Sequence, residues 1–475
     1  MTERRFLPKL FLMKTILVGI RLCLLLVTTA VVLAQPKEPA FSELETVIQA
    51  ELKETNTPGT AVVVINGGRI VFSKGFGVIS VETGAPVSTE TLFRLGSTTK
   101  MFTAAALVRA AEQSRLKLDT PIGSYAKGLV PELARLTTHQ LLSNSAGVAD
   151  FAAPVVVQED AALATMVRGW KADALFAEPG KIYSYASPGF WLAGYVLEEV
   201  SGKPYADAME ELIFKPLGMQ RTTLRPLAAM TYPLALGHNL NAESKKPEVI
   251  RPMFNNVAMW PAGSIFSSAN ELARFVTAFL AGGKLEGKEV LSPSLFAKLS
   301  GKHIAMPGDP NAFYGYGLMN FEDRGVRLLM HGGFSRGYGS MIQMAPDHGF
   351  AVIVLTNKSG EMLNKATTKA KELFLPLKPA VAEPPKKAIP LTAADLTAFA
   401  GKFVNGPQTW EIIATNGKLT LKAEGAEFVL SKVADWRLAF GAELENELVL
   451  VPGADRRAEY VFNGLYSAKR VGANK

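Results

Sequence analysis

Two kinds of serine motif in this chain could carry nucleophilic chemistry. Ser-x-x-Lys places a lysine one helical turn after a serine, where the amine can take the hydroxyl proton. It begins at Ser97, Ser114 and Ser124. Gly-x-Ser-x-Gly, centred on Ser335, is typical of a nucleophile held in a sharp turn between a strand and a helix. The residues around each serine decide between these motifs.

The residues after Ser335 do not suit such a turn. The sequence continues with Arg336-Gly337-Tyr338-Gly339 and then strand-like residues, so no helix is predicted to begin there. The motif also needs an acid and then a histidine downstream, and His348, in a short turn, is the one histidine that remains. We therefore expect that Ser335 is not the nucleophile.

The context of Ser97 is more favourable to catalysis. The stretch FRLGSTTK, in which Ser97 is the serine, leads directly into the alanine-rich stretch MFTAAAL, which predicts a buried helix. Unpaired N–H groups at the start of that helix favour a developing alkoxide, and burial favours the neutral, basic form of Lys100. Ser114 and Ser124 lie in polar or loop segments and are expected at the surface. The alternative for Ser97 is a helix-capping serine beside a solvated lysine.

Hydrophobic periodicity outlines the elements that position these residues. We predict a first helix over 41–54 and a hairpin of strands 61–65 and 69–72 around Asn66-Gly67-Gly68. The middle of the chain is mostly helical, and strands return near the end of this region. The predicted helices are 101–112, 190–200, 205–214, 271–280 and 362–373, and the predicted strands are 326–330, 339–344 and 350–356.

A proline-rich segment separates this region from a smaller one. Residues 376–390 contain five prolines and predict a stiff linker. Beyond them, a short helix over 393–400 and alternating segments at 410–414, 418–422 and 448–451 predict a small all-β, barrel-like domain over 391–475, with Asn416-Gly417 in one hairpin.

The first 34 residues differ from the rest. Five basic residues (Arg4, Arg5, Lys9, Lys14 and Arg21) precede the apolar run LCLLLVTTAVVLA, which ends at Ala34. We interpret residues 1–34 as a secretory signal that is cleaved after Ala34, so the protein is expected to be exported, periplasmic or extracellular, with transient membrane contact through this segment only. Two alternatives stay open: the segment is kept as an anchor, or translation starts at Met13.

Composition excludes several other classes of protein. The formal charge of +8 falls to +4 without residues 1–34, and no run of Lys or Arg stands out, so no nucleic-acid partner is predicted. Cys23 is the one cysteine and lies in the signal segment, so we expect neither a thiol nucleophile nor a disulfide. The five histidines form no zinc-binding motif, and no metal or other cofactor is expected.

Several segments in order carry a family resemblance. From about Phe41 to Leu375 the chain resembles the serine β-lactamase and penicillin-binding protein superfamily, in its class C-like branch of class C β-lactamases, D-aminopeptidases, D-Ala-D-Ala carboxypeptidases and family VIII carboxylesterases. The matching stretches are FRLGSTTKMFTAAAL, LTTHQLLSNSAGV, EPGKIYSYASPGFWLAGYVLEEVSGKPYADAMEELIFKPLGM, PAGSIFSSANELARF, YGYGL and HGGFSRGY. The resemblance implies an α+β hydrolase domain over 35–375, an antiparallel sheet packed with helices plus a mostly helical subdomain.

The resemblance also implies a second catalytic motif. The family's Tyr-x-Asn falls on Tyr185-Ala186-Ser187, so Tyr185 is the candidate proton shuttle. Ser187 replaces the asparagine that holds a substrate amide, and its hydroxyl reaches less far. Ser268-Ala269-Asn270 also fits Ser-x-Asn, but it begins a predicted helix and is expected to be a cap.

The family's third motif, Lys-Thr-Gly on a strand edge, falls on His331-Gly332-Gly333. The resemblance implies that the N–H groups of Ser97 and Phe334 form the oxyanion hole, and that the two glycines let the backbone approach the substrate closely. Histidine is mostly neutral at pH 7, so a strong anchor for a substrate carboxylate is not assured.

The implied chemistry is acyl transfer through Ser97 without a metal. Lys100 and Tyr185 share the removal of the hydroxyl proton, and Tyr185, aided by His331, protonates the leaving group. The expected substrate is a small molecule or a peptidoglycan-like peptide: a β-lactam, a D-amino-acid peptide or a small ester. The alternative is a penicillin-binding sensor that is acylated without turnover.

Overall fold

The central sheet joins strands from both ends of residues 38–375. The computed structural model describes residues 38–153, 158–381 and 384–472, so the predicted signal segment lies outside the described residues. Every adjacent pair of strands in the sheet is antiparallel. In hydrogen-bonded order the strands are β2 (Arg69–Gly77), β1 (Gly59–Asn66), β14 (Phe350–Thr356), β13 (Tyr338–Ala345), β12 (Val326–Ser335), β11 (Met319–Asp323), β10 (Phe313–Tyr314) and β9 (Ile304–Ala305).

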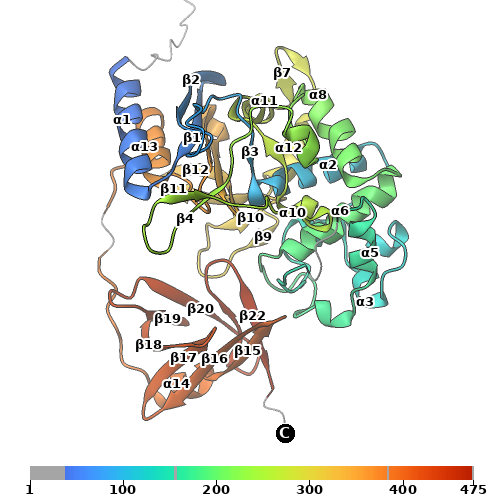
Figure 1. Cartoon of the computed structure of the whole chain (residues 1–475). Helices are drawn as coiled ribbons and strands as arrows, with labels where there is room; N and C mark the ends of the chain where they lie inside the picture. The colour runs from blue at the N-terminus through green and yellow to red at the C-terminus, as the bar shows by residue number, and fades with distance from the viewer. Residues whose placement is uncertain (1–37, 154–157, 382–383, 473–475) are drawn as a thin grey trace, which may run out of the picture. The chain divides into compact units, whose positions relative to one another are not determined.

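Both faces of this sheet are covered by helices. Successive side chains of a strand point to opposite faces, and β1 is apolar on both: Val62 and Val64 join one core cluster, while Val63 joins another. The first cluster packs against α1 (Glu38–Thr55) and α13 (Asn364–Phe374), which lie side by side (Figure 1). The second packs against α2 (Thr99–Glu112) and α11 (Ala269–Leu280).

Helices are the main regular elements between Thr99 and Leu299, although loops and turns occupy more of this segment than the sequence predicted. The further helices are α3 (Pro131–Ala134), α4 (Thr138–Leu142), α5 (Ala162–Arg168), α6 (Ser187–Ser201), α7 (Tyr205–Met209), α8 (Lys215–Leu217), α9 (Pro226–Ala229), α10 (Trp260–Gly263) and α12 (Pro293–Leu299). Short strand pairs lie between them: β3 (Phe93–Arg94) with β6 (Phe266–Ser267), β4 (His238–Leu240) with β5 (Pro247–Val249), and β7 (Lys284–Leu285) with β8 (Lys288–Glu289).

One predicted helix is interrupted. The segment 205–214 begins as α7 and then widens into a π-helical turn, Glu210–Phe214, closed by the Lys215 N–H donating to the Glu210 carbonyl. Pro216 follows and has no N–H to donate to the carbonyl four residues before it. In a π turn each N–H bonds to the carbonyl five residues before it, so the bonding pattern changes just before the proline. Sequence periodicity did not indicate this turn.

The last eight strands close into a barrel, which confirms the predicted small β fold. They are β15 (Gly401–Asn405), β16 (Gln408–Thr415), β17 (Lys418–Ala423), β18 (Ala426–Ala434), β19 (Arg437–Phe440), β20 (Asn446–Pro452), β21 (Ala458–Phe462) and β22 (Ser467–Val471), with α14 (Ala393–Phe399) before them. Asn416 and Gly417, both with positive φ, turn β16 into β17 as predicted. All described residues, including the barrel, fall within one compact unit.

Candidate active site

Ser97 lies in a turn that is pressed against the central sheet. It belongs to a 3-10 turn, Gly96–Thr98, that runs directly into α2, and its side chain is half-buried. Gly96 has a φ of +55°, and a Cβ there would lie 2.5 Å from the Phe334 carbonyl oxygen. Ser340 of β13 fixes the same turn, because its hydroxyl donates to the Leu95 carbonyl over 2.6 Å. The sheet therefore sets the position of the Ser97 hydroxyl.

Lys100 lies directly beside the Ser97 hydroxyl. Its Nζ is 3.0 Å from Ser97 Oγ, 2.8 Å from the Ala262 carbonyl oxygen and 3.4 Å from Ser187 Oγ. The side chain is fully buried and forms no ion pair with a carboxylate of the described residues. Burial lowers the pKa of Lys100 to about 7, although the negative charge of Asp150 opposes this effect. The amine is therefore partly neutral near pH 7 and able to accept a proton.

Tyr185 completes a close group with Ser97 and Lys100. Its hydroxyl is hydrogen bonded to Ser97, and Lys100 Nζ lies 4.7 Å from the centre of its ring. Burial raises the pKa of Tyr185 well above its usual value. The Tyr185 phenol therefore keeps its proton in the free protein. It can act as a shuttle by donating this proton to one partner while it accepts a proton from another.

Ser187 begins α6 and faces the same space. Its hydroxyl is the third polar neighbour of Lys100, and its N–H donates to Asp150 Oδ1 over 3.0 Å. Burial raises the pKa of Asp150, an effect that this N–H opposes. Sequence reasoning did not single out Asp150, although it lies just after the stretch LLSNSAGV, which had been recognised.

His331 lies on β12, and its ring is next to that of Tyr185, on the edge of the group formed by Ser97, Lys100 and Tyr185. It is buried, its Nε2 is 3.2 Å from the Tyr314 hydroxyl, and its ring centre is 6.1 Å from that of Tyr185. Burial and the charge of Lys100 lower the pKa of His331 to about 3, so the ring is neutral. Its hydrogen-bonding partners are Tyr314 and the Gly332 carbonyl, so the predicted help to Tyr185 involves no direct hydrogen bond.

The two glycines after His331 face different neighbours. A Cβ on Gly333 would lie 1.9 Å from the Leu95 carbonyl oxygen, whereas one on Gly332 would meet the Met362 side chain at 3.0 Å. Both glycines thus allow other parts of the same chain to approach β12 closely. At Gly333 the approaching part is the turn before Ser97. This contact brings the Phe334 backbone next to Gly96, as an oxyanion hole shared by Phe334 and Ser97 requires.

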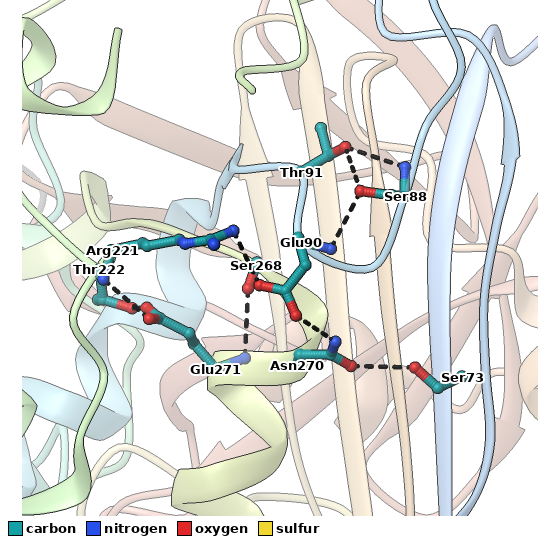
Figure 2. Close-up of polar contacts among 9 residues, drawn as sticks. All are labelled: Ser73, Ser88, Glu90, Thr91, Arg221, Thr222, Ser268, Asn270 and Glu271. Carbon is teal, nitrogen blue, oxygen red and sulfur yellow. Dashed lines mark hydrogen bonds and ion pairs between the residues drawn. The ribbon is translucent and has the colours of Figure 1, made fainter. Parts of the chain in front are cut away.

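Of the two rival serines, Ser335 lines the same cavity as Ser97, whereas Ser268 does not line it. The Ser268 hydroxyl accepts the Glu271 N–H and caps α11, as predicted, and Asn270 bonds to Glu90 and Ser73 (Figure 2). Ser335 ends β12 and is followed by a turn and then β13, so no helix begins there.

Ser97 opens onto a cavity of about 360 Å³. Its walls include Ser187, Phe334 and two cations, Arg94 and Arg336. Arg94 is buried beside the rings of Phe254 and Phe266 and donates to Ser264 Oγ over 2.9 Å. Neither arginine pairs with a carboxylate of the described residues, and burial lowers the pKa of Arg94 to about 10. Sequence reasoning missed Arg94, because its type alone does not reveal burial.

The described residues contain no group of three or more His, Cys, Asp or Glu side chains arranged to hold a metal ion. Across 38–153, 158–381 and 384–472, we find no helix with the length and hydropathy of a bilayer span.

The chain is similar in sequence to two kinds of curated bacterial protein. It is 28% identical over 358 residues to Penicillin-binding protein 4 of Amycolatopsis lactamdurans, covering 72% of this chain and 93% of that protein. It is 24% identical over 340 residues to Protein flp of Staphylococcus aureus strain MW2, covering 68% of this chain. This chain spans 64% of the length of Protein flp.

Solved structures share the fold. The crystal structure of SurE matches with a TM-score of 0.72 and 22% identity, over 91% of this chain and 99% of that one. The octameric penicillin-binding protein homologue from Pyrococcus abyssi matches with a TM-score of 0.63 and 23% identity, over 90% of this chain and 99% of that one. The β-lactamase/D-alanine carboxypeptidase from Pseudomonas syringae matches with a TM-score of 0.60 and 21% identity, over 72% of this chain and all of that one.

The family follows from the extent of the sequence match. The model of the family described as Beta-lactamase matches residues 44–374, which is most of the chain. This chain therefore belongs to the Beta-lactamase family, within the superfamily of serine β-lactamases and penicillin-binding proteins.

Proposed function

We propose that this protein is an exported serine hydrolase that works through an acyl-enzyme on Ser97. The observation that carries the proposal is the pair of Ser97 and Lys100, with 3.0 Å between Oγ and Nζ and no carboxylate paired to the buried amine. A buried lysine without an acid partner is costly to keep charged, which makes it a base near neutral pH. Family membership supports a hydrolase of this general kind.

The proposed reaction has two halves. Ser97 Oγ attacks the substrate carbonyl while its proton passes to the pair of Lys100 and Tyr185. The resulting oxyanion accepts hydrogen bonds from the N–H groups of Ser97 and Phe334. The tetrahedral adduct then loses its leaving group, which takes the proton back through Tyr185. A water molecule, deprotonated by the same groups, attacks the acyl carbonyl and restores the free Ser97 hydroxyl.

The walls of the cavity favour a substrate with a negative charge. His331 is neutral, so it does not supply the charge that lysine supplies in the family motif. Arg94 and Arg336 line the cavity that contains Ser97 and have no carboxylate partner among the described residues. We propose that they attract an acidic group, such as the carboxylate of a β-lactam or of a D-amino-acid peptide.

The test offers one substrate from each class to the full chain. A chromogenic cephalosporin, a p-nitrophenyl ester and a D-alanyl anilide are incubated with the wild type, Ser97→Ala and Ser335→Ala, while turnover and protein mass are followed. We expect turnover of at least one substrate and an acyl adduct on Ser97, with both lost in Ser97→Ala and kept in Ser335→Ala.

Three results would contradict this proposal. An adduct that persists in Ser97→Ala but disappears in Ser335→Ala would transfer the nucleophile to Ser335. One stoichiometric burst without turnover would identify a sensor instead of a hydrolase. No adduct with any substrate would reject acylation chemistry of these three classes.

A further inference from the structure

The barrel is hydrogen bonded to the segment that carries Tyr185. The Tyr185 N–H donates to the Leu465 carbonyl over 3.0 Å. The Ser467 hydroxyl donates to the Tyr183 carbonyl over 2.7 Å, and the Ser467 N–H donates to Ser184 Oγ over 3.1 Å. Three consecutive residues ending at the catalytic tyrosine are thus bonded to one turn of the barrel, between β21 and β22.

A buried amide of the barrel links this segment to Asp150. Asn405, at the end of β15, accepts the Asp150 N–H at 3.0 Å and donates to the Ser467 carbonyl at 2.7 Å and to Ser184 Oγ at 3.3 Å. Asn405 and Ser467 are fully buried. Buried polar groups whose bonds are all made hold their neighbours in one arrangement. The Asn405 side chain therefore couples the positions of Asp150 and Ser184.

A third barrel residue contacts the site through its side chain. Tyr466 is hydrogen bonded to the Asp150 carboxylate. Its ring meets the Tyr185 ring edge to face, with 6.2 Å between ring centres. Asp150 in turn accepts the Ser187 N–H, and its charge acts on Lys100. Tyr466 thus contacts both the Asp150 carboxylate and Tyr185, the candidate proton shuttle.

We infer that the barrel is a working part of the active site, in which Asn405, Tyr466 and Ser467 position Asp150 and Tyr185 against Ser97 and Lys100. The inference rests on the function proposed for Ser97. The three barrel residues are positioning residues, because their contacts reach Ser97 only through Tyr185, Ser184 and Asp150.

The opposite side of the Tyr185 segment shows why the barrel is needed. There Asn144 accepts the Ser184 N–H at its carbonyl over 3.0 Å and the Ala186 N–H at its side chain over 3.2 Å. Without the barrel, the segment keeps these bonds on one side only. Small displacements of a catalytic group lower rates strongly, so loss of the second side should slow acylation.

The test uses the full chain with substitutions in the barrel. Asn405→Ala and Tyr466→Phe remove the positioning groups. As controls, Asn446→Ala makes the same change at an exposed barrel position, and Tyr460→Phe removes the hydroxyl of another buried barrel tyrosine. Hydrogen exchange of peptides covering 144–150 and 183–187 reports position without needing activity. A fluorophosphonate reagent, which needs only an activated serine, reports the labelling rate of Ser97.

In Asn405→Ala we expect faster exchange in both peptides and a labelling rate lower by roughly tenfold, with the two controls close to wild type. Unchanged exchange in both peptides would overturn the inference, whatever happens to labelling. If the wild type is not labelled at Ser97, the proposed function fails, and the exchange result still decides whether the barrel positions this segment.

Tyr466→Phe supplies a test that general destabilisation would not mimic. The titratable groups facing Lys100 are Asp150, Tyr185 and His331, and Tyr466 bonds to Asp150. Loss of the hydroxyl removes a bond that favours ionised Asp150, so less negative charge supports protonated Lys100. The midpoint of the labelling rate against pH should move to lower pH in Tyr466→Phe and stay in place in Tyr460→Phe. An unmoved midpoint together with unchanged exchange of both peptides in Tyr466→Phe would overturn the role given to Tyr466.

Discussion

Ser97 and Ser268 both lie at the start of a helix, but in different surroundings. The Ser268 hydroxyl accepts the Glu271 N–H, within a network that includes the ion pair of Glu90 and Arg221 (Figure 2). Ser97 makes no capping bond, and its hydroxyl lies beside a buried lysine and a buried tyrosine. A helix terminus is thus common to a structural and a candidate catalytic serine.

The difference lies in how the nearby charges are compensated. Near Ser268, the Glu90 carboxylate is paired with Arg221 over 3.0 Å, and the Glu271 carboxylate accepts hydrogen bonds from the Arg221 N–H and the Thr222 hydroxyl. Around Ser97, Lys100 is buried without such a partner, so its proton is weakly held. An uncompensated charge in a buried place costs stability and makes proton transfer possible at neutral pH.

The largest expected effect is that of Ser97→Ala. Removing the nucleophile should lower acylation and turnover by roughly four orders of magnitude or more, as for other nucleophile deletions. The folded state should be retained, since the Ser97 side chain is only half-buried. Steady-state rates and the mass of the acyl adduct measure the loss, with circular dichroism as the control. Residual rates within tenfold of wild type would place the nucleophile elsewhere.

Lys100→Met should be next. It keeps an apolar side chain of similar length in the buried space but removes the base, so acylation should fall by about 10²- to 10⁴-fold. Stability should change little or increase, because a costly buried amine is replaced. Labelling kinetics and thermal unfolding measure the two effects together. A large loss of stability with normal labelling would make Lys100 a structural residue.

Gly333→Ala tests the contact that brings β12 to the nucleophile turn. The new Cβ would meet the Leu95 carbonyl, so the strand or the turn must shift, at a cost of about 1–3 kcal/mol and with a loss of labelling of roughly 10²-fold. Gly332→Ala is the matched comparison and should cost less, because its Cβ meets the flexible end of Met362. Equal effects of the two substitutions would contradict this account.

The pH dependence of labelling should follow Lys100. Because the neutral amine is the base and its pKa is about 7, the rate should rise with pH through a midpoint near 7 and fall about tenfold per unit below it. In Asp150→Asn the midpoint should move to lower pH, since the charge that favours protonated Lys100 is gone. A midpoint near 10 would describe a solvated lysine.

The smallest effect on activity is expected for Ser268→Ala. Loss of a helix cap should lower the free energy of unfolding by about 1 kcal/mol, and the labelling rate of Ser97 should stay at the wild-type value. Chemical denaturation and labelling of the same sample check both statements. A slowed reaction without a loss of stability would show that the comparison of the two serines is wrong.

The sequence predicted the fold well where periodicity was strong. The hairpin of β1 and β2, the helices α2, α6 and α11 and the strands β13 and β14 lie where their patterns placed them. The π turn at Glu210–Phe214 was missed, because hydrophobic spacing barely differs between α and π turns.

The local chemistry of the site was also readable. Ser97 and Lys100 are one helical turn apart, so secondary structure alone brings them together. Tyr185, Ser187 and Phe334 were suggested by resemblance, and the structure gathers them around Ser97. The sequence did not indicate Arg94, Asp150 or Tyr466, because their roles depend on burial or on partners that are distant in the chain.

The sequence by itself therefore determined the elements, the serine–lysine pair and the family. Only the tertiary structure decided the electrostatics of the site and its neighbours. The pKa of Lys100 depends on burial by α6 and α10 and on Asp150, and the support of Tyr185 depends on a barrel turn 280 residues further along the chain. Periodicity encodes local geometry, whereas desolvation and charge depend on everything packed nearby, which no local pattern records.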